Sequence, residues 1–196
     1  IVVFFTVLLS IIIGVTLAWL ISAYDFPFRK FFRWALILPL AIPPYIGAYT
    51  YSGMVSYTGV IQRFFRNILG VELNQKYFDI MSIEGAIFIF TLFLFPYVYM
   101  VTMTFLEKQS AGLIESARLL GSSAIGIFFR VIIPVSRGAI VAGSTLIALE
   151  VLSDYGVVSY LGVQTFSTAI FKSWISLGDV DSAIRLAGIL MVVVFI

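Results

Sequence analysis

Long apolar runs alternate with short polar segments along the whole chain. Five of these runs are predicted membrane spans, at residues 1–23, 34–57, 85–106, 138–153 and 182–196. A helix needs about 20 apolar residues to cross the hydrocarbon core of a bilayer, and most of the runs approach that length. Pro39, Pro43 and Pro44 interrupt the second run. The pattern predicts an all-α, polytopic transmembrane helical bundle formed by a single domain, residues 1–196.

Composition supports a membrane protein and excludes several other classes. The chain is 61% hydrophobic and 11% charged, whereas soluble domains average about 25% charged residues. Its mean hydropathy is +1.10. The net charge is only +2, and no basic run is interleaved with exposed aromatic residues. We therefore expect membrane lipid, and no nucleic acid, among its partners.

The inventory of reactive side chains argues against an enzyme. The sequence has no Cys and no His, which removes thiolate chemistry and imidazole metal ligands. It also lacks the Gly-x-x-x-x-Gly-Lys-Ser/Thr phosphate loop. We expect no ATP hydrolysis by this chain, no cofactor and no stable metal site. The alternative is a membrane-embedded enzyme or assembly factor, which would need paired acid–base or metal-ligand groups at one depth.

Lys and Arg counts in the connections predict which side faces the cytoplasm. Seven lie on one side, namely Arg29, Lys30, Arg33, Lys108, Arg118, Arg130 and Arg137. Five lie on the other, namely Arg63, Arg66, Lys76, Lys172 and Arg185. The bias places the Phe28–Arg33 loop and the polar segment 107–137 in the cytoplasm.

The segment 107–137 is the most informative part of the chain. Its centre, ESARLLGSSAIGIFFRVIIP (residues 115–134), is mildly polar between apolar neighbours. Leu113, Ile114, Ala117 and Leu120 fall on one face of a helix, which predicts a short amphipathic helix. Glu115, Ser116 and Arg118 lie on the other side and can bond to a polar partner.

The same segment carries signals for a helix–turn–helix. Gly121 permits a turn with positive φ that ends the first helix. Ser122 and Ser123 can cap a second helix. Pro134 is expected near a helix start, where its missing N–H costs little. The alternative is an ordinary interfacial loop between two spans.

The spacing of Glu115, Ala117, Gly121 and Pro134 resembles the cytoplasmic coupling loop of ABC-importer permeases. The resemblance implies a type I permease fold and a separate ATP-binding subunit that docks on residues 107–137. Ser116 departs from the wider pattern, which favours Ala. Ser is small enough to occupy the same groove, so docking is still expected.

Three further segments resemble the permeases of ferric-iron ABC importers: Leu38–Tyr51, Phe95–Gly121 and Leu152–Trp174. That resemblance implies ferric iron as the solute, a periplasmic or lipid-anchored binding protein, a second permease half in the same chain or a homodimer, and a bacterial inner membrane. It also leads us to expect a fragment corresponding to the first half of a longer permease. Permeases for thiamine, phosphonate, sulfate or polyamines are the alternatives within the class.

Ionisable groups inside a membrane are costly and often functional. Glu150 and Asp154 stand at i and i+4, on one side of a helix. Together with Tyr155 they offer the oxygen ligands that hard cations prefer, and we consider them a candidate substrate pathway. The alternatives are that Glu150 pairs with an Arg or packs at a polar helix interface, and that Asp154 caps the next segment.

Overall fold

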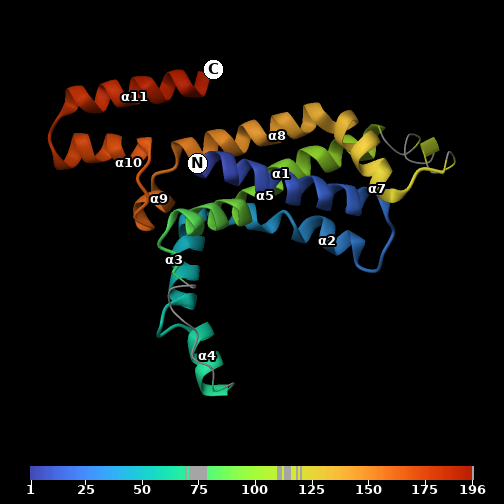
Figure 1. Ribbon diagram of the computed structural model, residues 1–196, viewed down its shortest axis with the longest axis horizontal. Coiled ribbons are helices and arrows are strands. Elements are labelled where there is room, and N and C mark those ends of the chain that lie inside the picture. Colours follow the sequence, from blue (N-terminus) through green and yellow to red (C-terminus); the bar gives the residue numbers. More distant parts are fainter. Residues whose placement is uncertain are drawn as a thin grey trace. The chain divides into compact units, whose positions relative to one another are not determined.

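The computed structural model describes residues 1–68, 70, 79–109, 112, 116, 117, 119 and 121–195. The helices in these residues are α1 (Val2–Ala23), α2 (Arg29–Ala35), η1 (Leu38–Ala41), α3 (Pro44–Val55), α4 (Val60–Ile68), α5 (Ile83–Gln109), α7 (Ala124–Ile127), η3 (Phe128–Ile132), α8 (Ile133–Ser153), α9 (Gly156–Tyr160), α10 (Phe166–Phe171), η4 (Lys172–Ser176) and α11 (Val180–Phe195). Here η1 is a 3-10 turn, whereas η3 and η4 are π turns. Figure 1 shows these helices in chain order. The all-α prediction is confirmed for the described residues.

Three helical stretches in the described residues are long and apolar enough to cross a membrane: Val2–Ala23, Ile83–Lys108 and Ala124–Ser153. The broken pair Arg29–Ala41 and Pro44–Ile68 makes a fourth if it counts as one span. The third stretch begins well before residue 138, where the sequence predicted a span to start. Helix α11, with 16 described residues, is not among these stretches.

The prolines of the second apolar run divide it into separate helices. Ile42 is extended, with φ −111° and ψ 122°, as expected for a residue that precedes a proline. Pro44 then starts α3, where its missing N–H has no helical partner to lose. On the other side of the break, α2 already begins at Arg29, so part of the predicted cytoplasmic loop is helical.

The described chain forms two compact units. The first unit holds residues 1–3, 43–90 and 149–196, and the second holds residues 4–42 and 91–148. We describe each by itself. The assignment of residues 1–196 to one domain stays a prediction.

In the second unit, α1 and α8 both pack closely against α5, because each has a glycine at the point of contact. A Cβ on Gly14 of α1 would lie 3.0 Å from both Tyr99 N and Val98 Cβ. A Cβ on Gly143 of α8 would lie 2.8 Å from Val98 Cα. Small residues commonly allow such backbone contact between membrane helices. Figure 1 shows α1, α5 and α8 running alongside one another.

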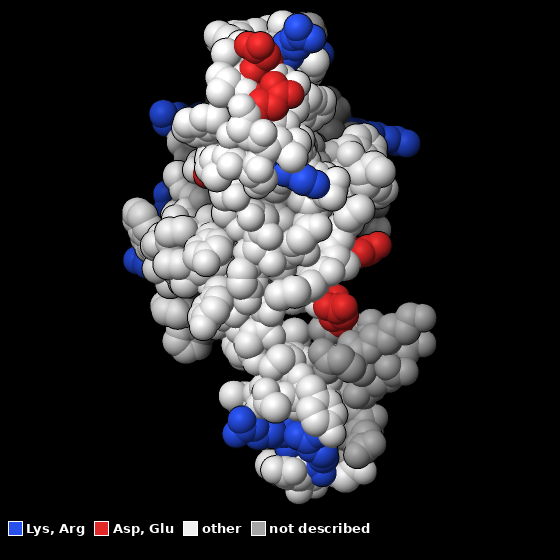
Figure 2. Space-filling view, turned by 90° about the vertical axis from the view of Figure 1, so that its left-hand side faces the viewer, with Lys and Arg blue, Asp and Glu red and all other residues white. Residues whose placement is uncertain are grey.

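One apolar cluster fills the interior of this unit. It joins α1, α5, α7 and η3 through buried side chains of Ala18, Ile21, Phe95, Tyr99, Met103, Leu106, Ile127 and Ile132. The four members on α5 recur at helical spacing, which puts them on one face. Outside this core, α1 leaves large apolar side chains such as Phe4 (64% exposed) and Ile12 (55% exposed) uncovered. Much of the face in Figure 2 is likewise uncharged, as expected for a surface that meets lipid or another helix.

In the first unit, aromatic contacts join α3 to α9. The ring centroids of Tyr45 and Tyr49 lie 5.8 Å and 5.9 Å from that of Tyr160, both in edge-to-face geometry. A Cβ on Gly156 would lie 3.3 Å from Tyr45 Cβ, so glycine suits this contact. Figure 1 shows α10 and α11 lying side by side in the same unit.

Candidate functional site

The described part of residues 107–137, which we call the predicted coupling segment, has the turn that the sequence predicted. Gly121 has φ 76°, a left-handed conformation in which glycine is favoured. The N–H of Ser122 donates to the carbonyl oxygen of Ala117 at 3.1 Å. This bond is the six-to-one bond of a Schellman motif, with Gly121 just past the helix end. The described helical residues before Gly121 are therefore followed by a defined turn.

Side chains in this segment divide into an inner and an outer set. Ala117 is half-buried and packs against the apolar cluster of the second unit. Ser116 is exposed, and its hydroxyl donates to Gly112 O at 2.7 Å. Leu119 is 89% exposed, and Ile125, beyond the turn, is 70% exposed. Glu115 lies outside the described residues, as do Leu113, Ile114, Arg118 and Leu120 of the predicted amphipathic helix.

Ser123 caps the second helix, as predicted. Its Oγ accepts the N–H of Gly126 at 3.1 Å. Side-chain oxygens at this position satisfy an N–H that has no partner within the helix.

Pro134 is the second residue of α8, near the helix start that the sequence predicted. The helical stretch nevertheless continues upstream through η3 and α7 to Ala124. The π turn Phe128–Ile132 directly precedes α8, and the N–H of Ile133 donates to Phe128 O, five residues back. A proline inside a helix loses one hydrogen bond and its ring meets the carbonyl four residues earlier. The wider π turn relieves this conflict. It also lets Ile127 and Ile132, five residues apart, both face the apolar cluster.

An ion pair that sequence analysis did not identify lies at the end of α5. Arg33 Nη2 donates to Glu107 Oε2 at 2.8 Å, which ties α2 to the last turns of α5. The buried Tyr99 also contributes, because its hydroxyl donates to Arg33 O at 3.1 Å. The signal in the sequence was the presence of charged residues at the edges of the apolar runs, Arg33 and Glu107 among them. The sequence does not say which charges pair across 74 residues.

The three residues of the candidate substrate pathway lie together in the first unit, where α8 ends. The N–H of Asp154 donates to Glu150 O at 3.0 Å, so the two stand one helical turn apart. Asp154 Oδ1 accepts the N–H of Val157 at 2.9 Å, which caps α9. Tyr155 stacks on Phe171 with ring centroids 4.1 Å apart.

Burial is the main influence on the Asp154 carboxyl. It raises the pKa above the ordinary value of 3.8, and the nearby Glu150 raises it as well. The N–H groups of Val158 and Val157 lower the pKa, because they stabilise the carboxylate. Within the described residues, no three Asp or Glu side chains come together in a way that would hold a metal ion. The geometry thus offers two carboxylates and a phenol beside one another, one carboxylate already committed to a helix cap.

The helical fold and a family match define a class of protein: an all-α multi-pass membrane bundle of the type I ABC-importer permease kind. The chain belongs to the family described as binding-protein-dependent transport system inner membrane component, which it matches over residues 3–196.

Three relatives illustrate the range of that family. The chain is 30% identical over 184 residues to the Fe(3+)-transport system permease protein FbpB 2 of Haemophilus influenzae, covering 94% of this chain and 32% of that protein. It is 27% identical over 151 residues to the sulfate transport system permease protein CysW of Escherichia coli K12, covering 76% and 49%. It is also 27% identical over 156 residues to the spermidine/putrescine transport system permease protein PotB of Escherichia coli K12, covering 79% and 56%. The chain therefore spans between about a third and just over half of the length of these relatives.

Proposed function

We propose that this chain is part of the permease of an ABC importer, and that residues 107–137 dock a separate ATP-binding subunit on the cytoplasmic side. The single observation that carries the proposal is the turn at Gly121 in a chain of this family. This turn closes one helix and is followed at once by the capped start of the next. A short, rigid element of this kind suits the transfer of force from a soluble motor to membrane helices.

The docking surface that we propose consists of the exposed residues on both sides of the turn. Leu119 and Ile125 are apolar and largely exposed, and Ser116 adds a polar group beside them. Burying one Leu side chain against a partner contributes about 1.5–3 kcal/mol. Glu115, predicted on the polar face, is the charged contact of this proposal, whereas Ala117 faces the permease core and holds the segment in place.

Two connections would carry movement from the docked subunit into the spans. Glu107 at the end of α5 is bonded to Arg33 of α2. On the far side of the turn, α7, η3 and α8 form the continuous stretch Ala124–Ser153, which contains Pro134. Displacement of the coupling segment would thus reach α2, α5 and α8 together.

Ferric iron is the solute that we propose first. A relative that is 30% identical carries the name of an Fe(3+) permease, and Glu150, Asp154 and Tyr155 supply oxygen ligands of the kind that hard cations prefer. In this proposal a periplasmic or lipid-anchored binding protein delivers the solute to a bacterial inner membrane. A second permease half completes the pathway.

Sulfate is the second candidate. Relatives at 27–30% identity include several sulfate permeases. In addition, the described residues hold no cluster of three acidic groups. Permeases for polyamines, represented by PotB, share the same architecture.

The test is uptake and subunit docking in cells that express the full-length gene. Labelled ferric iron, sulfate and spermidine would be offered in parallel. Leu119→Gln and Glu115→Gln should lower both uptake and recovery of the ATP-binding subunit with the purified permease, at normal permease abundance. Glu150→Gln tests the pathway, because it removes one negative charge without changing the shape of the side chain.

The outcomes separate the parts of the proposal. Gene-dependent iron uptake that falls in the Leu119 variant supports both the solute and the docking surface. If sulfate responds to the gene and iron does not, the choice of iron is wrong. Full recovery of the ATP-binding subunit with Leu119→Gln would contradict the docking surface. Unchanged uptake by Glu150→Gln at unchanged abundance would remove Glu150 from the pathway.

A further inference from the structure

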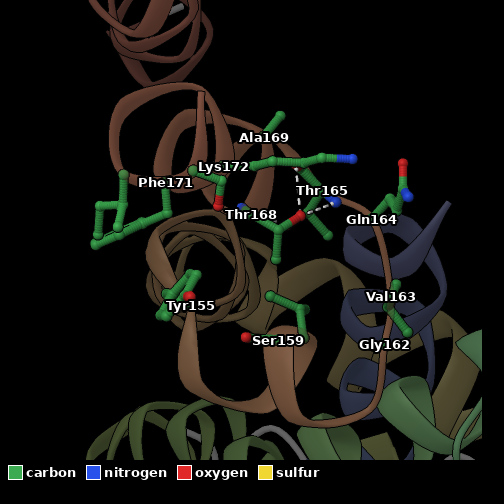
Figure 3. A pocket seen from close by; sticks show the side chains of 13 residues that line it. Tyr155, Ser159, Gly162, Val163, Gln164, Thr165, Thr168, Ala169, Phe171 and Lys172 are labelled. Atoms are coloured by element: carbon green, nitrogen blue, oxygen red, sulfur yellow. Dashed lines mark hydrogen bonds between the residues drawn. The ribbon is translucent and has the colours of Figure 1, made fainter. Parts of the chain in front are cut away.

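A cavity of about 460 Å³ lies in the first unit, along the chain from α9 to η4. Figure 3 shows the residues that line it. Those that matter for its chemistry are Tyr155, Ser159, Gln164, Thr168, Phe171 and Lys172. Its size is in the range of about 300–1,000 Å³ that is usual for small-ligand sites.

Local hydrogen bonds fix the wall of this cavity. Gly162 has φ 72°, and the N–H of Val163 donates to Val158 O at 2.8 Å, which closes α9 in a second Schellman motif. Thr165 and Thr168 form a reciprocal capping box at the start of α10. In Figure 3 the dashed lines at these two threonines mark part of that box.

A further bond ties the capping box to the end of α8. The hydroxyl of Ser167 donates to Asp154 O at 2.6 Å. Thr165 Oγ1 lies 2.8 Å from Ser167 Oγ. Since the Ser167 hydrogen is already used, Thr165 is the donor of that pair. The hydroxyls of Thr165 and Thr168 are thus bonded within the wall, and they hold its shape when no ligand is bound.

The lining of the cavity carries positive charge and no negative charge. Lys172 is the one charged residue among those that line it, and no carboxylate belongs to the lining. The carboxylate of the nearby Asp154 accepts the N–H of Val157 instead. In the part of the chain that the structure describes, the Lys172 ammonium has no ion-pair partner.

Uncommitted hydrogen-bond donors accompany this charge. In Figure 3 the Lys172 side chain runs past Thr168 and Thr165 toward the side where Gln164 lies. The lining therefore offers an ammonium, the Gln164 amide and the Ser159 hydroxyl, all of them donors. Tyr155 and Phe171, stacked on each other, form an aromatic part of the wall.

We propose that this cavity binds an oxyanion, with Lys172 as the charged contact and Gln164 and Ser159 as neutral donors. The proposal rests on the proposed function, because it places the anion site on the segment that follows the predicted outer end of α8. A positive charge without a carboxylate in the lining disfavours a bare ferric ion and favours an anion. The anion is either free, as sulfate or phosphate, or a ligand that accompanies the ferric ion.

Cysteine protection in the purified full-length protein tests the site directly. The 196 residues contain no Cys, so Ser159→Cys adds one thiol within this segment. Its alkylation by N-ethylmaleimide is followed on the peptide that contains residue 159. Phosphate, sulfate and ferric citrate are added separately, each against chloride at equal ionic strength.

Two variants and a matched control decide the role of the charge. In the Ser159→Cys background, Lys172→Gln should raise the anion concentration needed for half-maximal protection about tenfold, the usual effect of losing one charge-assisted hydrogen bond. Gln164→Glu should weaken protection as well, because it adds a negative charge at the same place. Lys30→Gln removes a charge from the other unit and should leave protection unchanged. Thermal unfolding of each variant confirms that it is folded.

The outcomes distinguish the site from the transport function. Protection that depends on Lys172, but not on Lys30, supports the proposal. Protection by phosphate or sulfate identifies a free anion, whereas protection by ferric citrate alone identifies an anion bound to iron. Absence of protection by all three probes, or equal protection in the Lys172 variant, overturns the site even if uptake is gene-dependent. If protection depends on Lys172 and no solute responds to the gene, the anion site stands and the proposed function fails.

Discussion

Arg33 and Glu107 lie 74 residues apart in the sequence, and their side chains meet at 2.8 Å. Arg33 is on α2 and Glu107 is near the end of α5, two residues before that helix stops. The backbone of Arg33 is bonded as well, because its carbonyl accepts the hydroxyl of Tyr99. These contacts hold α2 against α5 where the coupling segment begins.

A double-mutant cycle measures that pair. Arg33→Gln, Glu107→Gln and the combined variant should show a coupling of about 0.5 kcal/mol, since exposed pairs contribute little. The two side chains are 40% and 29% exposed. Chemical unfolding in detergent is the measurement. The cycle of Lys30→Gln with Glu107→Gln is the control and should be additive; equal coupling in the two cycles would show that the contact contributes nothing specific.

The close approach of α8 to α5 predicts that Gly143 resists substitution. Gly143→Ala would place a Cβ 2.8 Å from Val98 Cα, so one helix must shift. Overpacking of this kind costs about 1–3 kcal/mol. Gly138→Ala on the same helix meets nothing within 4 Å and should raise stability slightly, by up to about 1 kcal/mol. Thermal unfolding of the two variants compares them, and an equal response would contradict the packing argument.

Gly121 should also be sensitive to substitution, but because of its backbone conformation rather than its packing. No atom lies within 4 Å of a Cβ added there, but its φ is 76°. Gly121→Ala therefore strains the backbone by about 1–2 kcal/mol without any clash. Gly112→Ala, also in open space and without a positive φ, is the matched control. Limited proteolysis of the segment should speed up for Gly121→Ala alone.

The raised pKa of Asp154 predicts a defined pH dependence of the stability of the folded protein. Burial raises its pKa above 3.8 in the folded state, so the folded protein binds this proton more tightly than the unfolded chain. The stabilising effect of that proton is present at low pH and is lost as pH rises from about 4 through the folded pKa. Asp154→Asn keeps an acceptor for the N–H of Val157 and does not titrate.

Comparison of the wild type with Asp154→Asn isolates the contribution of the Asp154 carboxyl. Relative to Asp154→Asn, the wild type should lose thermal stability between about pH 4 and its folded pKa, and the difference should then level off. Melting curves recorded from pH 4 to pH 8 provide the measurement. A constant difference over this range would mean that Asp154 has the same pKa in both states.

Local signals in the sequence predicted the local geometry well. Long apolar runs with few charges predict a bundle of membrane helices, because a helix satisfies the hydrogen bonds of its own backbone inside the bilayer. The left-handed turn at Gly121 and the cap at Ser123 follow from properties of single residues, so they were predictable. The capping role of Asp154 was among the alternatives for the same reason.

Features that depend on contacts between distant segments were not predictable. Nothing in the sequence pairs Arg33 with Glu107, because several other charges stand at the edges of apolar runs. Leu119 was missed because an apolar side chain that faces outward differs from a core residue only once the fold is known. The π turn before α8 was not predicted, because the sequence pattern gave no sign of it.

The π turn before Pro134 has a consequence for insertions and deletions. A π turn is equivalent to one residue inserted into an α-helix. Removing Arg130 would bring Ile127 and Ile132 to a spacing of four, which keeps both on one helical face. The proline would then meet the carbonyl four residues before it, so the shorter helix also requires Pro134→Ala. In an alignment of relatives, a one-residue gap at 128–132 should therefore coincide with the loss of this proline.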